Sequence, residues 1–162
     1  MAQEIERKFL VVGEYKHLAH SSIHIVQGYV ASGRRTVRVR ISDDRAWLTI
    51  KGPSHDGGLS RFEWEIEIES RRALELLPLV EGALIDKRRD FIDVDGHTCE
   101  VDEFYGDNEG LVLAEVELAS EDEPFMKPDF IGREVTGDRR FYNSHMRNYP
   151  FKLWKEEISE AR

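Results

Sequence analysis

Eight stretches of this chain alternate apolar and charged residues, which is the pattern of β-strands. Side chains on a strand point alternately to its two sides, so each stretch predicts one charged face and one apolar face. The predicted strands are residues 4–12, 23–31, 36–42, 45–51, 61–69, 83–94, 98–105 and 111–118. Short turn-rich segments separate these strands, as in antiparallel sheets. A sheet that closes into a barrel leaves no strand edge unpaired. A mainly β fold is therefore predicted, an eight-stranded antiparallel barrel with a few helices outside.

Helix signals are fewer. Residues 70–82, SRRALELLPLVEG, carry leucines at helical spacing between a capping Ser70 and Gly82. Shorter helices are predicted over 14–20 and 138–148. A chain of 162 residues fits one domain, residues 1–162, that buries about two thirds of its unfolded surface. The tail, YPFKLWKEEISEAR, is left open as a plug for one barrel end, a dimer contact or a frayed end.

The charged faces carry blocks of one sign: RVR is basic, whereas EWEIE and EVE are acidic. Like charges two residues apart on a strand lie about 7 Å from each other and repel, so a ligand would explain their persistence. Carboxylates suit hard cations such as Mg²⁺ or Mn²⁺, and Arg or Lys suits phosphate oxygens. The pattern favours charged faces turned inward, around a polyphosphate with metal. Two alternatives remain: a barrel with a highly charged outside, and a lipocalin-like carrier with an apolar interior.

The overall charge limits the partners. With 32 acids, 23 bases and a net charge of -9, the chain lacks the basic character of a nucleic-acid coat. An anion can bind only where bases gather locally or a cation intervenes. The single cysteine, Cys99, is interpreted as a core residue, and the six histidines show no zinc-site spacing. No membrane span or export signal is visible, which predicts a cytoplasmic protein without a membrane partner.

Several motifs follow one another in order. EIERK places Glu4, Glu6 and Lys8 on one face of the first predicted strand. VRVR at 37–40, TIKG at 49–52, SRFEWEIEI at 60–68 and K-x-R at 87–89 follow, then CEVDEF at 99–104 and GLVLAEVEL at 110–118. VTGDRRFYN at 135–143 ends the series. This series resembles the CYTH family, also called triphosphate tunnel metalloenzymes, over residues 1 to about 145; Phe141 replaces a usual tyrosine.

The resemblance implies an eight-stranded tunnel with a polar interior and helices outside. It implies that two Mg²⁺ or Mn²⁺ ions are bound by five carboxylates: Glu4, Glu6, Asp102, Glu115 and Glu117. It implies phosphate binding by Lys8, Arg38, Arg40, Lys51, Lys87 and Arg89. The implied catalytic set is Glu4, Glu6, Lys8, Glu63 and Glu65, of which Glu63 and Glu65 orient basic residues or water. Tyr29 either hydrogen-bonds Lys8 in the tunnel or is an ordinary barrel tyrosine.

The expected function is metal-dependent hydrolysis of a small-molecule triphosphate, inorganic tripolyphosphate first, to pyrophosphate and phosphate. Adenylyl cyclase and thiamine triphosphatase activities are alternatives within the family, because the motif residues do not separate them. No aromatic cluster beyond Trp47, Trp64 and Trp154 offers a pocket for a base, which favours the smallest substrate. A noncatalytic polyphosphate- or nucleotide-binding module is the alternative from another class. A homodimer is left open.

Overall fold

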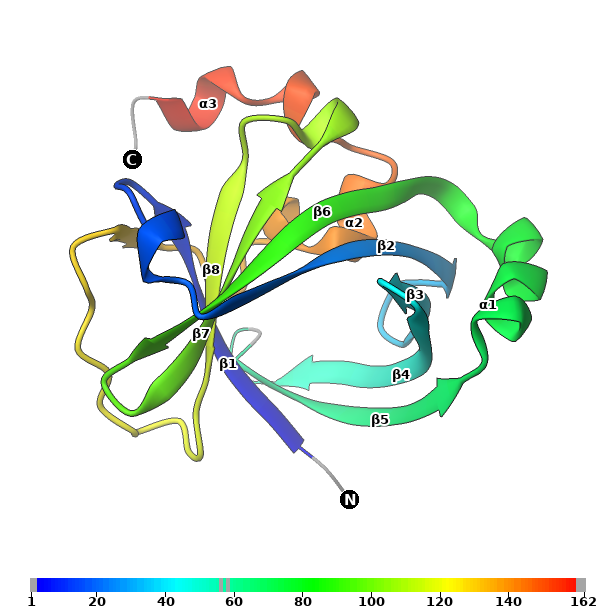
Figure 1. Ribbon diagram of the computed structural model, residues 1–162, viewed down its shortest axis with the longest axis horizontal. Coiled ribbons are helices and arrows are strands. Elements are labelled where there is room, and N and C mark those ends of the chain that lie inside the picture. Colours follow the sequence, from blue (N-terminus) through cyan, green and yellow to red (C-terminus); the bar gives the residue numbers. More distant parts are fainter. Residues whose placement is uncertain (1–2, 56, 58, 160–162) are drawn as a thin grey trace.

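The computed structural model describes residues 3–55, 57 and 59–159, without the side chains of residues 3, 4 and 159. Within these ranges the strands form one antiparallel sheet in the order β5-β4-β3-β2-β6-β7-β8-β1-β9, and β5 also pairs with β1 (Figure 1). The strands are β1 (Gln3–Val11), β2 (Ser21–Ala31), β3 (Thr36–Ser42), β4 (Arg45–His55), β5 (Ser60–Ile68), β6 (Glu81–Val94), β7 (His97–Phe104), β8 (Val112–Glu117) and β9 (Ile131–Glu134). The predicted eight-stranded antiparallel barrel is confirmed, with β9 as an additional strand.

The sequence analysis missed β9. This strand has four residues, IGRE, and follows a segment containing Pro124 and Pro128 without apolar–polar alternation. It forms by pairing with the end of β1, where Phe9 faces Glu134 and Val11 faces Ile131. A strand this short depends on its neighbour rather than on its own pattern.

Helices are shorter than predicted. The expected helix over 70–82 is α1 (Ser70–Leu76) followed by a 3₁₀ turn, η3 (Leu77–Leu79), because Pro78 cannot continue the hydrogen-bonding pattern. Residues 14–20 contain only a 3₁₀ turn, η1 (Lys16–Leu18). The remaining helical elements are η4 (Gly106–Asn108), η5 (Arg139–Phe141), α2 (Asn143–Met146), η6 (Phe151–Leu153) and α3 (Glu156–Ser159). None of the helices in the described ranges is both long and apolar enough to cross a membrane.

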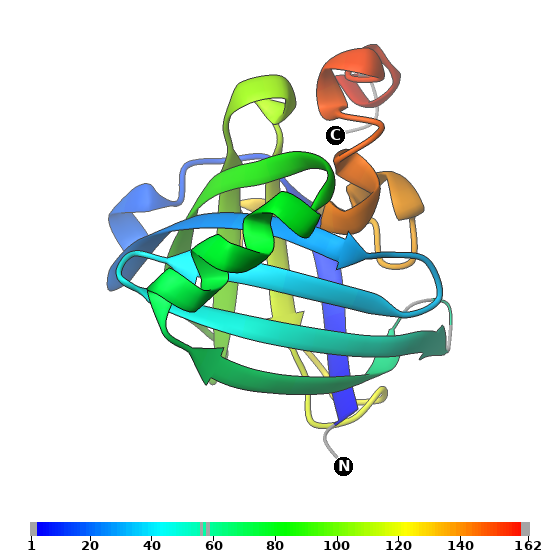
Figure 2. The same ribbon diagram turned by 90° about the vertical axis from the view of Figure 1, so that its right-hand side faces the viewer.

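Two apolar clusters cover the outside of the barrel. One lies on β1, β6, β7 and β8, where Phe9, Val101 and Val116 pack beneath the chain that carries Tyr15 and Phe130. The other lies beneath α1, which crosses the outer face of β3 and β4 (Figure 2), and its members are Val39, Ala46, Ala73, Val30, Ile41, Leu48, Ile68, Leu76 and Leu77. The apolar faces of these strands therefore point outward, as predicted.

One part of the outer face departs from this arrangement. Trp64 and Ile66 on β5 were expected to pack under helices, but they are 46% and 47% exposed. Ile68, at the end of the same strand, does pack against the α1 cluster. Because α1 is only seven residues long, it reaches β3 and β4 and leaves the middle of β5 uncovered.

A third apolar cluster closes one end of the barrel; we call it the plug. Leu10 and Leu113 belong to it although they share a strand face with Lys8 and Glu115. Its members are Leu10, Ile85, Phe104, Leu111, Leu113, Val135, Phe141, Met146, Phe151, Trp154 and Ile158. The C-terminal elements lie over this end, at the top of Figure 1. Of the three roles left open for the tail, the structure supports the plug.

Candidate active site

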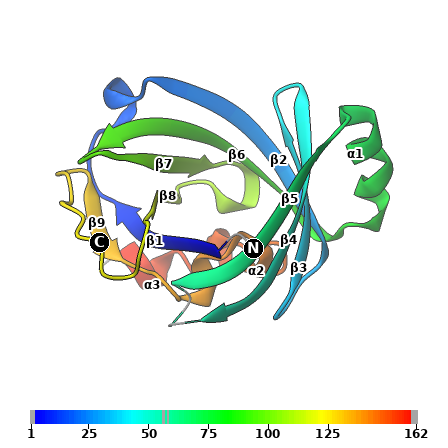
Figure 3. The same cartoon turned by 90° about the horizontal axis from the view of Figure 1, so that it is seen from below.

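A polar cavity of about 700 Å³ lies inside the barrel. The plug closes the upper end of the barrel, and Figure 3 views the barrel from below, from the opposite end. Twelve of the predicted site residues line it: Glu6, Lys8, Tyr29, Arg38, Arg40, Lys51, Glu63, Glu65, Lys87, Arg89, Glu115 and Glu117. Asp102 lies behind this lining, and the side chain of Glu4 is outside the described residues. The charged faces therefore turn inward, which excludes the apolar interior of a lipocalin-like carrier.

Acidic side chains occupy one sector of the wall, formed by β7, β8, β1 and β5. The strand register sets Glu6 opposite Glu117 and sets Glu115 between Lys8 and Glu100. Burial opposes the charge on Glu115, but Lys8 and a hydrogen bond from Glu6 together hold the pKa of this carboxyl well below its usual value. Burial raises the pKa of Glu100, and Glu115 adds to the rise. Several carboxyl groups thus crowd together, so this sector attracts cations.

Basic side chains occupy the opposite sector, on β6, β3 and β4. Arg38 is 7% exposed and donates from Nη2 to Thr49 Oγ1 at 3.2 Å, while its buried Nε has no partner among the described residues. Burial, together with the nearby charges of Arg38 and Arg89, lowers the pKa of Arg40 to about 9. An unpartnered buried donor beside crowded cations is costly, and a bound anion would relieve that cost. This sector therefore fits phosphate.

Asp102 joins two of these cations. Its carboxylate accepts from Arg89 Nε at 2.7 Å and Nη2 at 2.9 Å, and it forms an ion pair with Lys87, whose Nζ lies 2.8 Å from Oδ2. Burial alone would raise the pKa of Asp102, but Arg89 and Lys87 overcome that effect and hold it well below its usual range. Burial lowers the pKa of Lys87 to about 7. Both carboxylate oxygens are engaged by cations, so metal ligation by Asp102 stays a prediction from the resemblance.

Lys8 lies at the boundary between the two sectors. Its Nζ donates to Phe141 O at 3.0 Å and lies 3.6 Å from Glu115 Oε1. Burial opposes its charge, but Glu115 and Glu6 outweigh burial and raise its pKa. Tyr29 lines the same cavity, where its hydroxyl accepts from Gln27 Nε2 at 3.4 Å. Lys8 is thus a charged group that faces the cavity.

The sequence analysis missed several lining residues: Gln27, Arg61, Glu100, His97, Tyr142 and Asn143. Glu100 and Arg61 carried a usable signal, because each lies two residues from a predicted site residue on the same strand face. Gln27 and Asn143 are isolated amides without a spacing pattern, and His97 lies at the start of β7. Only the three-dimensional arrangement brings them to the bore.

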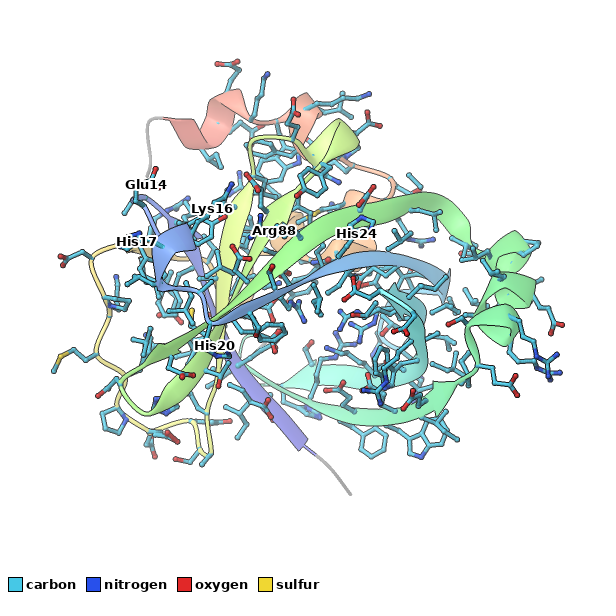
Figure 4. The ribbon with its side chains drawn as sticks, in the orientation of Figure 1. Glu14, Lys16, His17, His20, His24 and Arg88 are labelled. Atoms are coloured by element: carbon cyan, nitrogen blue, oxygen red, sulfur yellow. The ribbon has the colours of Figure 1, made fainter. Side chains whose placement is uncertain are left out.

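The histidines divide between outside and cavity. His17, His20 and His24 lie on the outside of the barrel near η1 and β2 (Figure 4), and His24 Nε2 contacts Asp86 Oδ1 at 2.6 Å. His97, in contrast, is among the residues that line the cavity. Its Nδ1 contacts Asp95 O at 2.9 Å and its Nε2 contacts the Glu123 carboxylate. Two acceptors require hydrogens on both ring nitrogens, so His97 is an imidazolium here.

We expect His97 to titrate above the ordinary value of about 6.5. The hydrogen bond that His97 donates to the Glu123 carboxylate raises the pKa of His97. A raised folded pKa means that this pair stabilises the fold fully below the unfolded pKa, and that its contribution is lost as pH rises through the folded pKa. An NMR titration of His97 measures this shift. Glu123→Gln should return the pKa towards the ordinary value while Asp122→Asn leaves it raised; an unshifted His97 in the wild type would contradict the assignment.

The acidic sector also fits a divalent cation in its chemistry. Oxygen ligands from one or two carboxylates suit Mg²⁺, which usually keeps waters and substrate phosphates in its shell. Glu6 and Glu115 share a hydrogen bond, and Glu117 and Glu100 are their cross-strand neighbours. Within the described part of the chain, no three His, Cys, Asp or Glu side chains already form a ligand cluster. A metal held here would therefore draw the rest of its shell from water or substrate.

Fold and cavity together define a tunnel barrel with a charged interior, divided into an acidic and a basic sector. The sequence profile of the CYTH domain matches residues 2–142, and the chain belongs to the CYTH domain family. An inorganic triphosphatase of Acetivibrio thermocellus is 48% identical over 159 residues, which are 96% of this chain and 100% of that protein. An inorganic triphosphatase of Nitrosomonas europaea is 37% identical over 145 residues, 86% and 93% of the two chains.

A solved structure gives the same picture. The crystal structure of an inorganic triphosphatase superposes with a TM-score of 0.65 at 33% identity, over 91% of this chain and 95% of the other. The similarity extends over nearly the whole barrel.

Proposed function

We propose that this protein is an inorganic triphosphatase that hydrolyses tripolyphosphate to pyrophosphate and phosphate with two Mg²⁺ or Mn²⁺ ions per active site, in the cytoplasm. The observation that carries the proposal is the cavity inside the barrel, which has a volume of about 700 Å³. Its basic sector and its acidic sector face each other. Relatives named inorganic triphosphatase match this chain over nearly all of their length. A polyanion would contact the basic sector, and cations would lie between it and the acidic sector.

The lining favours a substrate without a ring. Trp154 lies in the plug, Trp64 faces outward, and Trp47 is not among the residues found to line the cavity. Two tyrosines, Tyr29 and Tyr142, line the cavity, and their hydroxyl groups suit polar ligands. A nucleobase or thiazolium ring would need an apolar face to stack on. Inorganic tripolyphosphate needs none.

The chain's own residues supply binding and orientation. Arg38, Arg40 and Arg89 would hold phosphate oxygens, with guanidinium groups able to bind two oxygens at once. Lys8 would stabilise negative charge in the transferring group, since phosphoryl transfer depends mainly on positioning and electrostatics. Water adds across one P–O–P bridge, the bridging bond breaks, and pyrophosphate leaves. A divalent cation held by the carboxylates of the acidic sector would neutralise substrate charge and supply a more acidic water.

Phosphate release tests the proposal directly. Tripolyphosphate, ATP and thiamine triphosphate are each incubated with Mg²⁺, Mn²⁺ or EDTA. We expect the fastest release from tripolyphosphate and none with EDTA. Tight binding without release from any substrate would instead identify a noncatalytic binding module. Cyclic AMP formed from ATP would identify a cyclase, and preferred hydrolysis of thiamine triphosphate would move the substrate assignment.

Glu115→Gln is expected to lower kcat/KM for tripolyphosphate by more than about 100-fold, because even groups that only support a metal ligand usually contribute 10–100-fold. Glu115 lies between Lys8 and Glu100 in the acidic sector. The matched control is Glu67→Gln on β5, whose carboxylate pairs with Arg45 at 2.6 Å and is not among the lining residues. Equal rates for the Glu115→Gln variant and the wild type would remove the acidic sector from the mechanism.

A further inference from the structure

The segment 141–146 lies between the plug and the cavity. Phe141 and Met146 are 0% and 1% exposed within the plug. Tyr142, Asn143 and Ser144 line the cavity instead. The segment thus has an apolar side that anchors it and a polar side that faces the bore, so its polar groups are held in place by packing.

Asn143 connects two of the basic residues through hydrogen bonds. Its Oδ1 accepts from Lys87 Nζ at 2.8 Å and from Gln27 Nε2 at 3.0 Å. The other end of the Gln27 amide, Oε1, accepts from Arg40 Nε at 2.8 Å. A continuous chain of hydrogen bonds therefore runs from Lys87 on β6 through Asn143 and Gln27 to Arg40 on β3.

Only one orientation of the two amides satisfies this chain. Lysine and arginine carry donors and no acceptor, so an amide oxygen has to face each of them. With its oxygen on Arg40, Gln27 has its NH₂ group left for the Asn143 oxygen. Turning either amide over would set N–H groups against each other. The two cations at the ends therefore fix both amides, and the amides in turn fix the cations.

We propose that Asn143 is a positioning residue that holds Lys87 directly, and Arg40 through Gln27, in the arrangement that receives the substrate's phosphates; this inference rests on the proposed function. Gln27 and Lys87 are each 1% exposed, so neither side chain has solvent available to replace a lost partner. Without the Asn143 oxygen, Lys87 keeps its ion pair with Asp102, and Gln27 is free to rotate away from Arg40. Lys87 and Arg40 would therefore both be held less firmly in position.

The test measures binding separately from turnover. Isothermal titration calorimetry follows tripolyphosphate binding to metal-free wild type, Asn143→Ala, Gln27→Met and the double variant, with kcat and KM measured in parallel. We expect each single variant to bind roughly 10-fold or more weakly, in line with losses at supporting groups. Because both side chains act through the same series of hydrogen bonds, the double variant should lose no more affinity than the single variant that binds more weakly. His145→Gln on the same short helix, outside the lining, should bind as the wild type does.

Several results would overturn the proposal. Wild-type affinity in Asn143→Ala, or losses that add in the double variant, would show that the amides do not act as one chain. Should Asn143→Ala fail to fold, Gln27→Met breaks the same chain from β2, and unchanged affinity there is equally decisive. A wild type that binds tripolyphosphate without hydrolysing it would refute the proposed function alone, since the binding cycle still tests positioning. A wild type that does not bind would refute both.

Discussion

Asp102→Asn is expected to lower the free energy of unfolding by about 3–5 kcal/mol, the cost of leaving buried charges without their partner. Asp102 is 2% exposed and neutralises both Arg89 and Lys87. The asparagine has nearly the same shape, so the loss reports the missing charge rather than a cavity. Urea or guanidinium unfolding at neutral pH measures it. The effect is large because both cations are almost fully buried, Lys87 at 1% and Arg89 at 7% exposed.

The pH dependence of this effect has a definite sign. The pKa of Asp102 is depressed in the folded protein, so its stabilisation is present above the unfolded value, about 3.9, and is lost as pH falls through the folded pKa. The difference between wild type and variant should therefore be widest above pH 4 and should narrow below it. The control is Glu103→Gln, whose carboxylate meets Lys16 at 3.1 Å on the outside and should cost at most about 1 kcal/mol. Similar costs for the two variants would mean that Asp102 is not the central anion of the basic sector.

The inward direction of the charged faces was predictable from neighbouring residues. Arg38 and Val39 are both buried, Arg38 in the bore and Val39 beneath α1. Segregation of charge sign along each strand predicted which of the two faced a ligand. The strand register then brings the separate acidic motifs together, as with Glu6 and Glu117.

The end of the bore was not predictable from the same rule. Leu10 and Leu113 share their strand faces with Lys8 and Glu115, so alternation alone places them in the bore as well. They lie in the plug because residues 141–158, distant in sequence, pack onto that end. Asn143 likewise reaches the cavity through this packing, and a single amide leaves no periodic signal. Local patterns fixed the wall of the barrel, whereas contacts distant in sequence decide where the cavity stops.

Trp154→Ala is expected to lower the free energy of unfolding by about 3–5 kcal/mol, as usual for a large aromatic side chain removed from a core. Trp154 is 1% exposed and packs edge-on against Phe141 and Phe151, with ring centroids 5.2 Å and 5.0 Å away. Its Nε1 donates to Tyr149 O at 3.2 Å. Thermal or denaturant unfolding measures the loss, and Leu153→Ala, at a position 60% exposed, is the control with a change within about 0.5 kcal/mol.

The same substitution should also reach the cavity. Phe141 contacts Trp154 on one side, and its carbonyl oxygen accepts from Lys8 Nζ on the other. Loosening the plug therefore removes a fixed acceptor from Lys8 as well as the anchor of Asn143, so tripolyphosphate affinity should fall under conditions where the protein remains folded. A frayed tail, by contrast, would make Trp154→Ala as mild as Leu153→Ala in both measurements. Stability and affinity lost together would show that the C-terminal segment shapes the site as well as closing the barrel.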